Sequence, residues 1–223
     1  MHPPLIPFLL NRLSSFSALI PIIVALVKYR YLDRPLKIAF FFIAFSFILI
    51  LVNLYCAYHG ISNLVVFHFY AIFEFALVLW FFSYYVDGVL QRAIIPLVAV
   101  FAVWSVINFF FIQTGVQLNT YTRPIEAMII VIYCIAMFNK QTLADTTHRW
   151  SAASYNWIAV AFLVFYACSF FIFIFSNYFL VRGDKISLYF WEGYVYILVI
   201  ENLLLAAGFY KAAPRPSVKV PTG

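Results

Sequence analysis

Charged side chains are scarce in this chain of 223 residues, and this scarcity narrows its class more than any other feature. Asp, Glu, Lys and Arg supply 10% of the residues and apolar types supply 66%, whereas soluble domains carry about 25% charged residues. Glycine and proline, 7 and 10 residues, are too few for a collagen-like or low-complexity chain. The composition therefore predicts an integral membrane protein.

Cysteine is also rare, which argues against a disulfide-stapled secreted domain. The three cysteines, Cys56, Cys134 and Cys168, form no CxxC pair, as a metal or redox motif would require. All three fall inside or at the edge of apolar segments, so we interpret them as buried, unreactive thiols.

Long apolar segments occupy most of the chain. A spanning helix needs about 20 apolar residues, because the hydrocarbon core is about 30 Å thick and each residue rises about 1.5 Å. The segments that meet this requirement are 13–29, 36–57, 64–86, 93–112, 123–139, 155–179 and 187–210. They predict an all-α, seven-transmembrane-helix bundle as one domain over 1–210. The proline-containing tail, 211–223, is expected to be a disordered cytoplasmic extension.

The basic residues are distributed unevenly between the two sides of this bundle. Most of the fourteen lie on one side of the membrane, in the first, third and fifth connections between segments and in the tail. They are Lys28, Arg30, Arg34, Lys37, Arg92, Lys140, Arg149, Lys211, Arg215 and Lys219. Because basic residues are retained on the cytoplasmic face, we expect the N-terminus outside and the C-terminus inside. This asymmetry explains the net charge of +6 without a nucleic-acid partner, and leaves the lipid bilayer as the expected surrounding.

Five ionisable residues lie inside the apolar segments. A charge at mid-bilayer costs roughly 2.5–3.5 kcal/mol on insertion scales, so it normally faces the bundle interior and has a partner or a function. The five are His68, Glu74, Glu126, Glu192 and Glu201. Their segments all begin at the outer face, so the five converge in depth between the outer third and the middle. We expect an outward-facing polar pocket there.

Helical geometry determines which of these residues can meet in the third segment. At about 100° per residue, Asn63, Tyr70 and Glu74 share one face. His68 lies about 120° from Glu74, so the two can flank one seam but cannot stack.

The last segment is more restrictive. Glu192 and Glu201 are on opposite helix faces, so a single pocket can take only one of them, together with Glu74 and Glu126. Tyr194 shares the face of Glu201.

Structural roles explain some of these residues equally well. Arg123 and Glu126 are spaced for an intrahelical ion pair, and Glu126 also complements the helix dipole. Glu192 is near enough to the outer interface to be solvated, and His68 alone is compatible with a hydrogen-bonded packing role. Glu74 has no basic neighbour in sequence, so it must be protonated or paired across helices.

Several enzyme and pigment classes lack their required residues. A retinal pigment needs a lysine in the middle of its last helix, and this segment has none before Lys211. Three histidine ligands for zinc cannot be assembled from His59 and His68, although a carboxylate-rich metal site of His68, Glu74 and Glu126 stays open. No GxSxG, HExxH, P-loop or dinucleotide motif occurs in a usable context. An enzyme is therefore the least favoured class, and no cofactor is expected.

The stretch from Asn63 to Phe75 carries a recognisable pattern: Asn63, His68, Tyr70 and Glu74 followed by an aromatic residue. It resembles the third-helix segment of small seven-helix membrane proteins common in Bacteroidota, in which N-x(4)-H-x-Y-x(3)-E-[FY] recurs. These proteins have no assigned activity. The resemblance therefore implies a bacterial inner-membrane location and little chemistry.

Three functions fit these observations. The first is a sensor or receptor-like module that binds a small ligand in the outer pocket and signals to a cytoplasmic partner near Arg34 and His148. The second is a proton-coupled small-solute transporter in which Glu74 and Glu201 carry protons. The third is an accessory subunit of a membrane complex, whose carboxylates pair with basic residues of a membrane protein partner.

Overall fold

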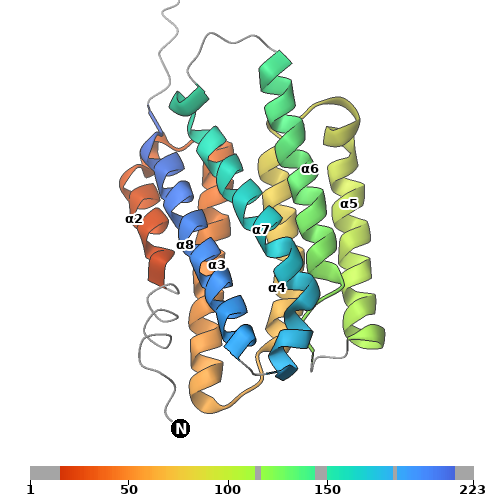
Figure 1. Ribbon diagram of the computed structural model, residues 1–223. Helices are drawn as coiled ribbons and strands as arrows, with labels where there is room; N and C mark the ends of the chain where they lie inside the picture. The colour runs from red at the N-terminus through yellow and green to blue at the C-terminus, as the bar shows by residue number, and fades with distance from the viewer. Residues whose placement is uncertain (1–15, 114–116, 144–149, 183–184, 214–223) are drawn as a thin grey trace, which may run out of the picture.

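The computed structural model describes residues 16–113, 117–143, 150–182 and 185–213, and these residues form an all-helical bundle (Figure 1). Seven α-helices lie within the described ranges: α2 (Leu19–Val27), α3 (Arg34–His59), α4 (Leu64–Phe82), α5 (Gly88–Ile107), α6 (Thr122–Leu143), α7 (Ser154–Arg182) and α8 (Lys185–Tyr210). A π-helical segment, η2 (Asn108–Ile112), continues α5. Short 3-10 turns, η1 (Tyr29–Tyr31) and η3 (Trp150–Ala152), precede α3 and α7.

Six of the helices, α3 to α8, are long and apolar enough to cross a membrane. Their outer faces carry large apolar side chains such as Phe41, Ile95 and Phe171, which are 55%, 81% and 64% exposed. A soluble protein buries such residues, whereas a bilayer solvates them, and helices satisfy their own backbone hydrogen bonds there. The chain is therefore an integral membrane protein.

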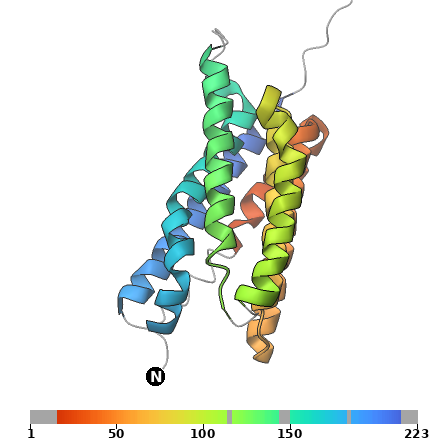
Figure 2. The same cartoon turned by 90° about the vertical axis from the view of Figure 1, so that its right-hand side faces the viewer.

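Successive helices run in opposite directions, so the bundle has two distinct ends (Figures 1 and 2). We call the end that holds residues 60–63 and 117–121 the Gln113 end, and the opposite end, which holds 28–33 and 83–87, the Lys140 end. The described basic residues at the Lys140 end are Lys28, Arg30, Arg34, Lys37, Arg92, Lys140 and Lys211.

Local sequence signals define both ends of α3. The Asp33 side chain accepts a hydrogen bond from the Leu36 backbone N–H at 3.2 Å, and Pro35 occupies the first turn, where its missing N–H has no cost. Gly60 ends the helix in a left-handed conformation with φ 67°, which glycine adopts without strain.

The last two helices pack closely because α8 carries a glycine at the contact. A Cβ atom on Gly208 would lie 2.6 Å from Ile158 Cδ1 and 3.2 Å from the Ser154 carbonyl oxygen, both on α7. Small residues permit this kind of backbone approach between membrane helices.

The structure differs from the sequence prediction in several places. The first predicted span, 13–29, is represented by the nine residues of α2, and residues 1–15 lie outside the described part of the chain. Helix α4 ends at Phe82 rather than at residue 86, and α5 begins at Gly88 rather than at 93. Helix α5 therefore begins before its apolar run. Its first turn contains polar residues, so a prediction from hydropathy did not include that turn.

Two further expectations concern exposure and the tail. Cys168 is exposed on the outer face of α7 and is not buried, while Cys56 and Cys134 are buried as predicted. A thiol is apolar enough to face either the lipid or the protein core. The location of a cysteine within a membrane span therefore does not determine whether it is buried in the protein. The predicted disordered tail lies, from residue 214 on, outside the described residues, as does His148.

Candidate functional site

Two acidic side chains converge on one guanidinium group inside the bundle. Arg123, in the first turn of α6, donates from Nη1 to Glu126 Oε2 at 2.7 Å and to Glu74 Oε2 of α4. The side chains of Glu74 and Glu126 are 2% and 0% exposed, and that of Arg123 is 14% exposed. The intrahelical pair considered from the sequence therefore forms, and the same arginine is also the cross-helix partner of Glu74.

Aromatic residues of α4 and α7 enclose this ion pair. The Tyr166 hydroxyl of α7 donates to Glu74 Oε1 at 2.6 Å. The Arg123 guanidinium lies 4.7 Å from the ring centroid of Phe173 and 5.7 Å from that of Tyr70. Cation–π contacts of this kind stabilise a cation most strongly where water is excluded.

Helix α8 adds a third carboxyl group. Glu201 is 4% exposed and interacts electrostatically with Glu74 and Arg123. Tyr194, on the same face of α8, lies beside Arg123. We call this set the Arg123 cluster, and its members are Arg123, Glu74, Glu126, Glu201, Tyr70, Tyr166 and Tyr194.

The charge composition of the Arg123 cluster is unbalanced. It contains three carboxyl groups and one guanidinium group, and one carboxyl oxygen each of Glu126 and Glu201 has no hydrogen-bond partner among the described residues. Uncompensated charge in a low-dielectric interior costs several kcal/mol per ion. The arrangement can therefore take up a further cation or a proton.

Three predicted site residues lie outside the cluster, and one of them, Asn63, lines the cavity described below. Glu192 is half-buried on the opposite face of α8 from Glu201. His68 is 2% exposed, and its Nε2 lies 3.2 Å from the Gln117 carbonyl oxygen. Its ring packs 5.4 Å from that of Phe109. His68 thus connects α4 to the segment that follows α5.

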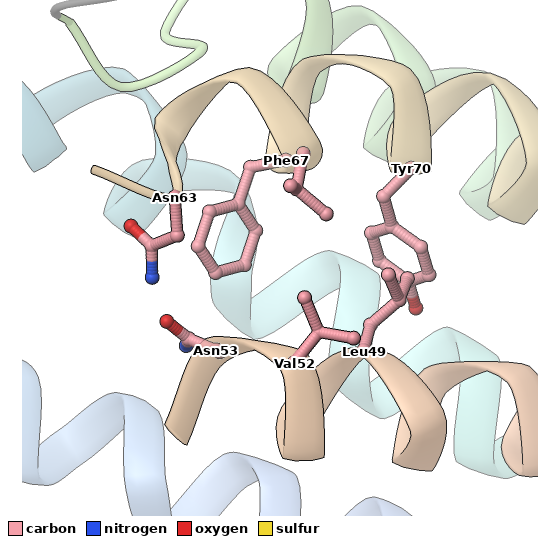
Figure 3. A pocket seen from close by; sticks show the side chains of 7 residues that line it. Leu49, Val52, Asn53, Asn63, Phe67 and Tyr70 are labelled. Atoms are coloured by element: carbon pink, nitrogen blue, oxygen red, sulfur yellow. The ribbon is translucent and has the colours of Figure 1, made fainter. Parts of the chain in front are cut away.

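A small cavity lies beside the cluster, in the seam between α3 and α4 (Figure 3). Asn53 and Asn63 face each other at one side of it, and Tyr70 closes the other. Its volume is about 10 Å³, which is room for about one water molecule. The Tyr70 hydroxyl hydrogen-bonds with Ser46 Oγ of α3 at 2.7 Å, so Tyr70 joins this cavity to the Arg123 cluster.

A second buried polar network occupies the connection between α5 and α6. The Asn108 side-chain amide lies 3.1 Å from Asn119 Oδ1 and 3.2 Å from Thr122 Oγ1. Asn177 of α7 exchanges two hydrogen bonds with the backbone of Leu118, at 2.8 and 2.9 Å. The network fixes the loop that places Arg123 at the start of α6.

Sequence reasoning missed two contributors to this site. Tyr166 is one of sixteen tyrosines, and no local spacing distinguishes it from the interfacial ones. Asn177 lies near the end of α7, where an asparagine normally faces water. Only the tertiary structure brings these side chains to Glu74 and Leu118.

The described residues give no indication of a metal site. Within the described ranges, no three His, Cys, Asp or Glu side chains are grouped so that they could hold a metal ion. The site considered from His68, Glu74 and Glu126 is not assembled, because His68 points toward α5 while the two carboxylates face Arg123.

Comparisons of the chain with protein-family models, with curated proteins and with solved structures gave no match in any of the three. The features of the chain that bear on its function are therefore the Arg123 cluster and the cavity beside it.

Proposed function

We propose that the chain is a sensor or receptor-like membrane module that binds a small polar ligand at the seam between α3 and α4. The observation that carries this proposal is the position of Tyr70, which lines the cavity and contacts Arg123 with the same ring. A ligand hydrogen-bonded to the amides of Asn53 and Asn63 would press on Tyr70, because the cavity has room for only one water molecule.

The Arg123 cluster is suited to pass such a displacement on. Arg123 belongs to α6 and contacts side chains of α4, α7 and α8. A shift of its guanidinium changes the contacts of four helices at once. Packed interfaces of this kind switch between discrete arrangements and do not deform continuously, so a local shift can become a helix movement.

We place the signalling output at the Lys140 end, on the cytoplasmic face of a bacterial inner membrane. The support is the concentration of basic residues there, which follows the positive-inside rule. This topology has seven spanning segments, as expected from the sequence, with the N-terminus outside and the C-terminus inside. Reporter fusions at residues 61, 87 and 213 test it, and a periplasmic reporter signal from residue 87 would contradict it.

The ligand is tested by native mass spectrometry of the protein gently extracted from its own membrane. We expect a small molecule that stays bound to the wild type and to Asn139→Ala, an exposed asparagine of α6, and is lost from Asn63→Ala. An empty pocket together with a retained protein partner would favour the accessory-subunit function instead.

One observation favours a proton-coupled transporter as the second candidate. The surplus of carboxyl over guanidinium groups in the Arg123 cluster is typical of proton-carrying sites in transporters. Proteoliposome assays separate the two functions. A transporter shows pH-dependent solute flux that Glu74→Gln abolishes in a folded protein, whereas a receptor shows ligand-dependent stabilisation without flux.

A further inference from the structure

A column of buried polar side chains descends from the Gln113 end to the Arg123 cluster, between α4, α5 and α6. Asn119 and Ser105 are 6% and 2% exposed, and Asn108, Thr122 and Glu126 are 0% exposed. An ionisable group such as Glu126 is uncommon inside a membrane protein and normally has a function, and buried Asn, Ser and Thr side chains normally hydrogen-bond across helices. None of them takes part in the cavity between α3 and α4.

Ring and side-chain contacts establish the order of the column. Aromatic contacts at 5.4 Å and 4.2 Å, His68 with Phe109 and Phe75 with Phe101, fix the register of α4 against α5. The contact of Asn108 with Thr122 fixes the register of α5 against α6.

The next polar residues follow one helical turn deeper. Ser105 is one turn from Asn108 and Glu126 is one turn from Thr122, and each stays on nearly the same face. The polar groups therefore succeed one another from the loop to Glu126.

Each level of the column has a polar atom without a protein partner. These atoms are Asn119 Nδ2, Asn108 Oδ1, Ser105 Oγ and Glu126 Oε1, and none has a hydrogen-bond partner among the described residues. Leaving such an atom unpaired in the interior is unfavourable, because its hydrogen bond to water is lost and not replaced. Buried water molecules normally satisfy atoms of this kind, and four in succession outline a hydrated path.

The column is closed on its deeper side. The rings of Phe75 and Phe101 lie 4.2 Å apart immediately beyond it. Val78, Leu79 and Ile130, all 0% exposed, continue this apolar layer toward the Lys140 end. A chain of water molecules that enters at the Gln113 end would therefore stop at the Arg123 cluster.

We propose that this column binds a chain of water molecules that connects the Gln113 end with Glu126, and that it gives protons access to the Arg123 cluster from that end. The water chain supplies a polar route to the groups that face Glu126, which are Arg123 of its own helix and Glu74 of α4. Hydration of the column depends on burial and hydrogen bonding only and requires no ligand in the cavity between α3 and α4.

The test is hydrogen–deuterium exchange of a thiol placed in the column. Ser105→Cys is nearly isosteric, and its S–H stretching band can be followed by infrared spectroscopy after transfer of the membrane-reconstituted full chain to D₂O. Cys56→Ala and Cys168→Ala simplify the background. Cys134 is the internal control, because it is 0% exposed in the apolar half of the bundle and donates to the Ala159 carbonyl oxygen.

A hydrated column predicts that the thiol introduced by Ser105→Cys exchanges about tenfold or more faster than that of Cys134, which must wait for local opening of the bundle. Equal, slow exchange at both positions would overturn the proposal. If Ser105→Cys does not fold, as judged by its midpoint of SDS unfolding, Thr122→Cys supplies the same comparison. The ligand and flux assays above are independent of this result, so the two proposals can fail separately.

Discussion

The hydrogen bond between Tyr166 and Glu74 gives the sharpest prediction, because its removal changes one oxygen atom and no charge. Tyr166→Phe deletes the hydroxyl that donates to Glu74 Oε1 at 2.6 Å. A hydrogen bond to a charged group contributes about 1.5–3 kcal/mol in soluble proteins, and contributions between membrane helices reach about 1.7 kcal/mol. We therefore expect Tyr166→Phe to lower the free energy of unfolding by about 1.5 kcal/mol.

Tyr133 supplies a matched control for this substitution. It is 1% exposed, against 0% for Tyr166, and its hydroxyl donates at 2.8 Å to the Leu90 carbonyl oxygen. That acceptor is neutral, so Tyr133→Phe removes the same atom and should cost about 0.5 kcal/mol. The comparison isolates the contribution of the carboxylate acceptor.

Reversible SDS unfolding of the protein in mixed micelles measures both free energies. A double-mutant cycle with Glu74→Gln adds the coupling energy, which we expect to be about 1 kcal/mol for Tyr166 and near zero for Tyr133. Equal losses for the two tyrosines, or no coupling between Tyr166 and Glu74, would refute the assignment of this hydrogen bond as a charge-assisted link between α4 and α7.

Three further predictions address other parts of the bundle by the same unfolding assay. Arg123→Met should cost about 3–5 kcal/mol because it leaves buried carboxylates without their cation, and adding Glu126→Gln should recover part of the loss; no recovery would argue against charge as the cause. Gly208→Ala should cost about 1–3 kcal/mol by forcing α7 away from α8, whereas Gly193→Ala, with nothing within 4 Å of the added Cβ, should be neutral or slightly stabilising. Asp33→Ala should cost about 1 kcal/mol by removing the N-cap of α3, and an unchanged midpoint would be inconsistent with the 3.2 Å contact.

The membrane-spanning elements were predictable from the sequence because hydrophobicity over about 20 residues reports directly on the solvent of a helix. Each of α3 to α8 overlaps its predicted segment, and the errors fall at the ends. At α5, the polar first turn conceals the true start of the helix at Gly88. Capping and turn geometry determine where a helix begins and ends, and hydropathy gives no information on either.

The cluster was predictable in part. Periodicity showed that Glu74 shares a face with Tyr70 and that Glu201 lies opposite Glu192. Besides Tyr166 and Asn177, the sequence did not predict the second contact of Arg123, which was interpreted only as a partner of Glu126 three residues away. Whether a guanidinium also reaches a carboxylate on another helix depends on how α4 and α6 are rotated about their axes, and local spacing does not determine this.

The separation of 49 residues between Glu74 and Arg123 also has a consequence for the biogenesis of the protein. At about 5–20 residues per second, Glu74 is made, and leaves the ribosome, roughly 2–10 s before its cationic partner. During that interval α4 has to enter the lipid with an uncompensated carboxyl group, or wait beside the insertion machinery until α6 arrives. A chain that stalls before Arg123 therefore keeps the carboxyl group of Glu74 in the membrane without its cation.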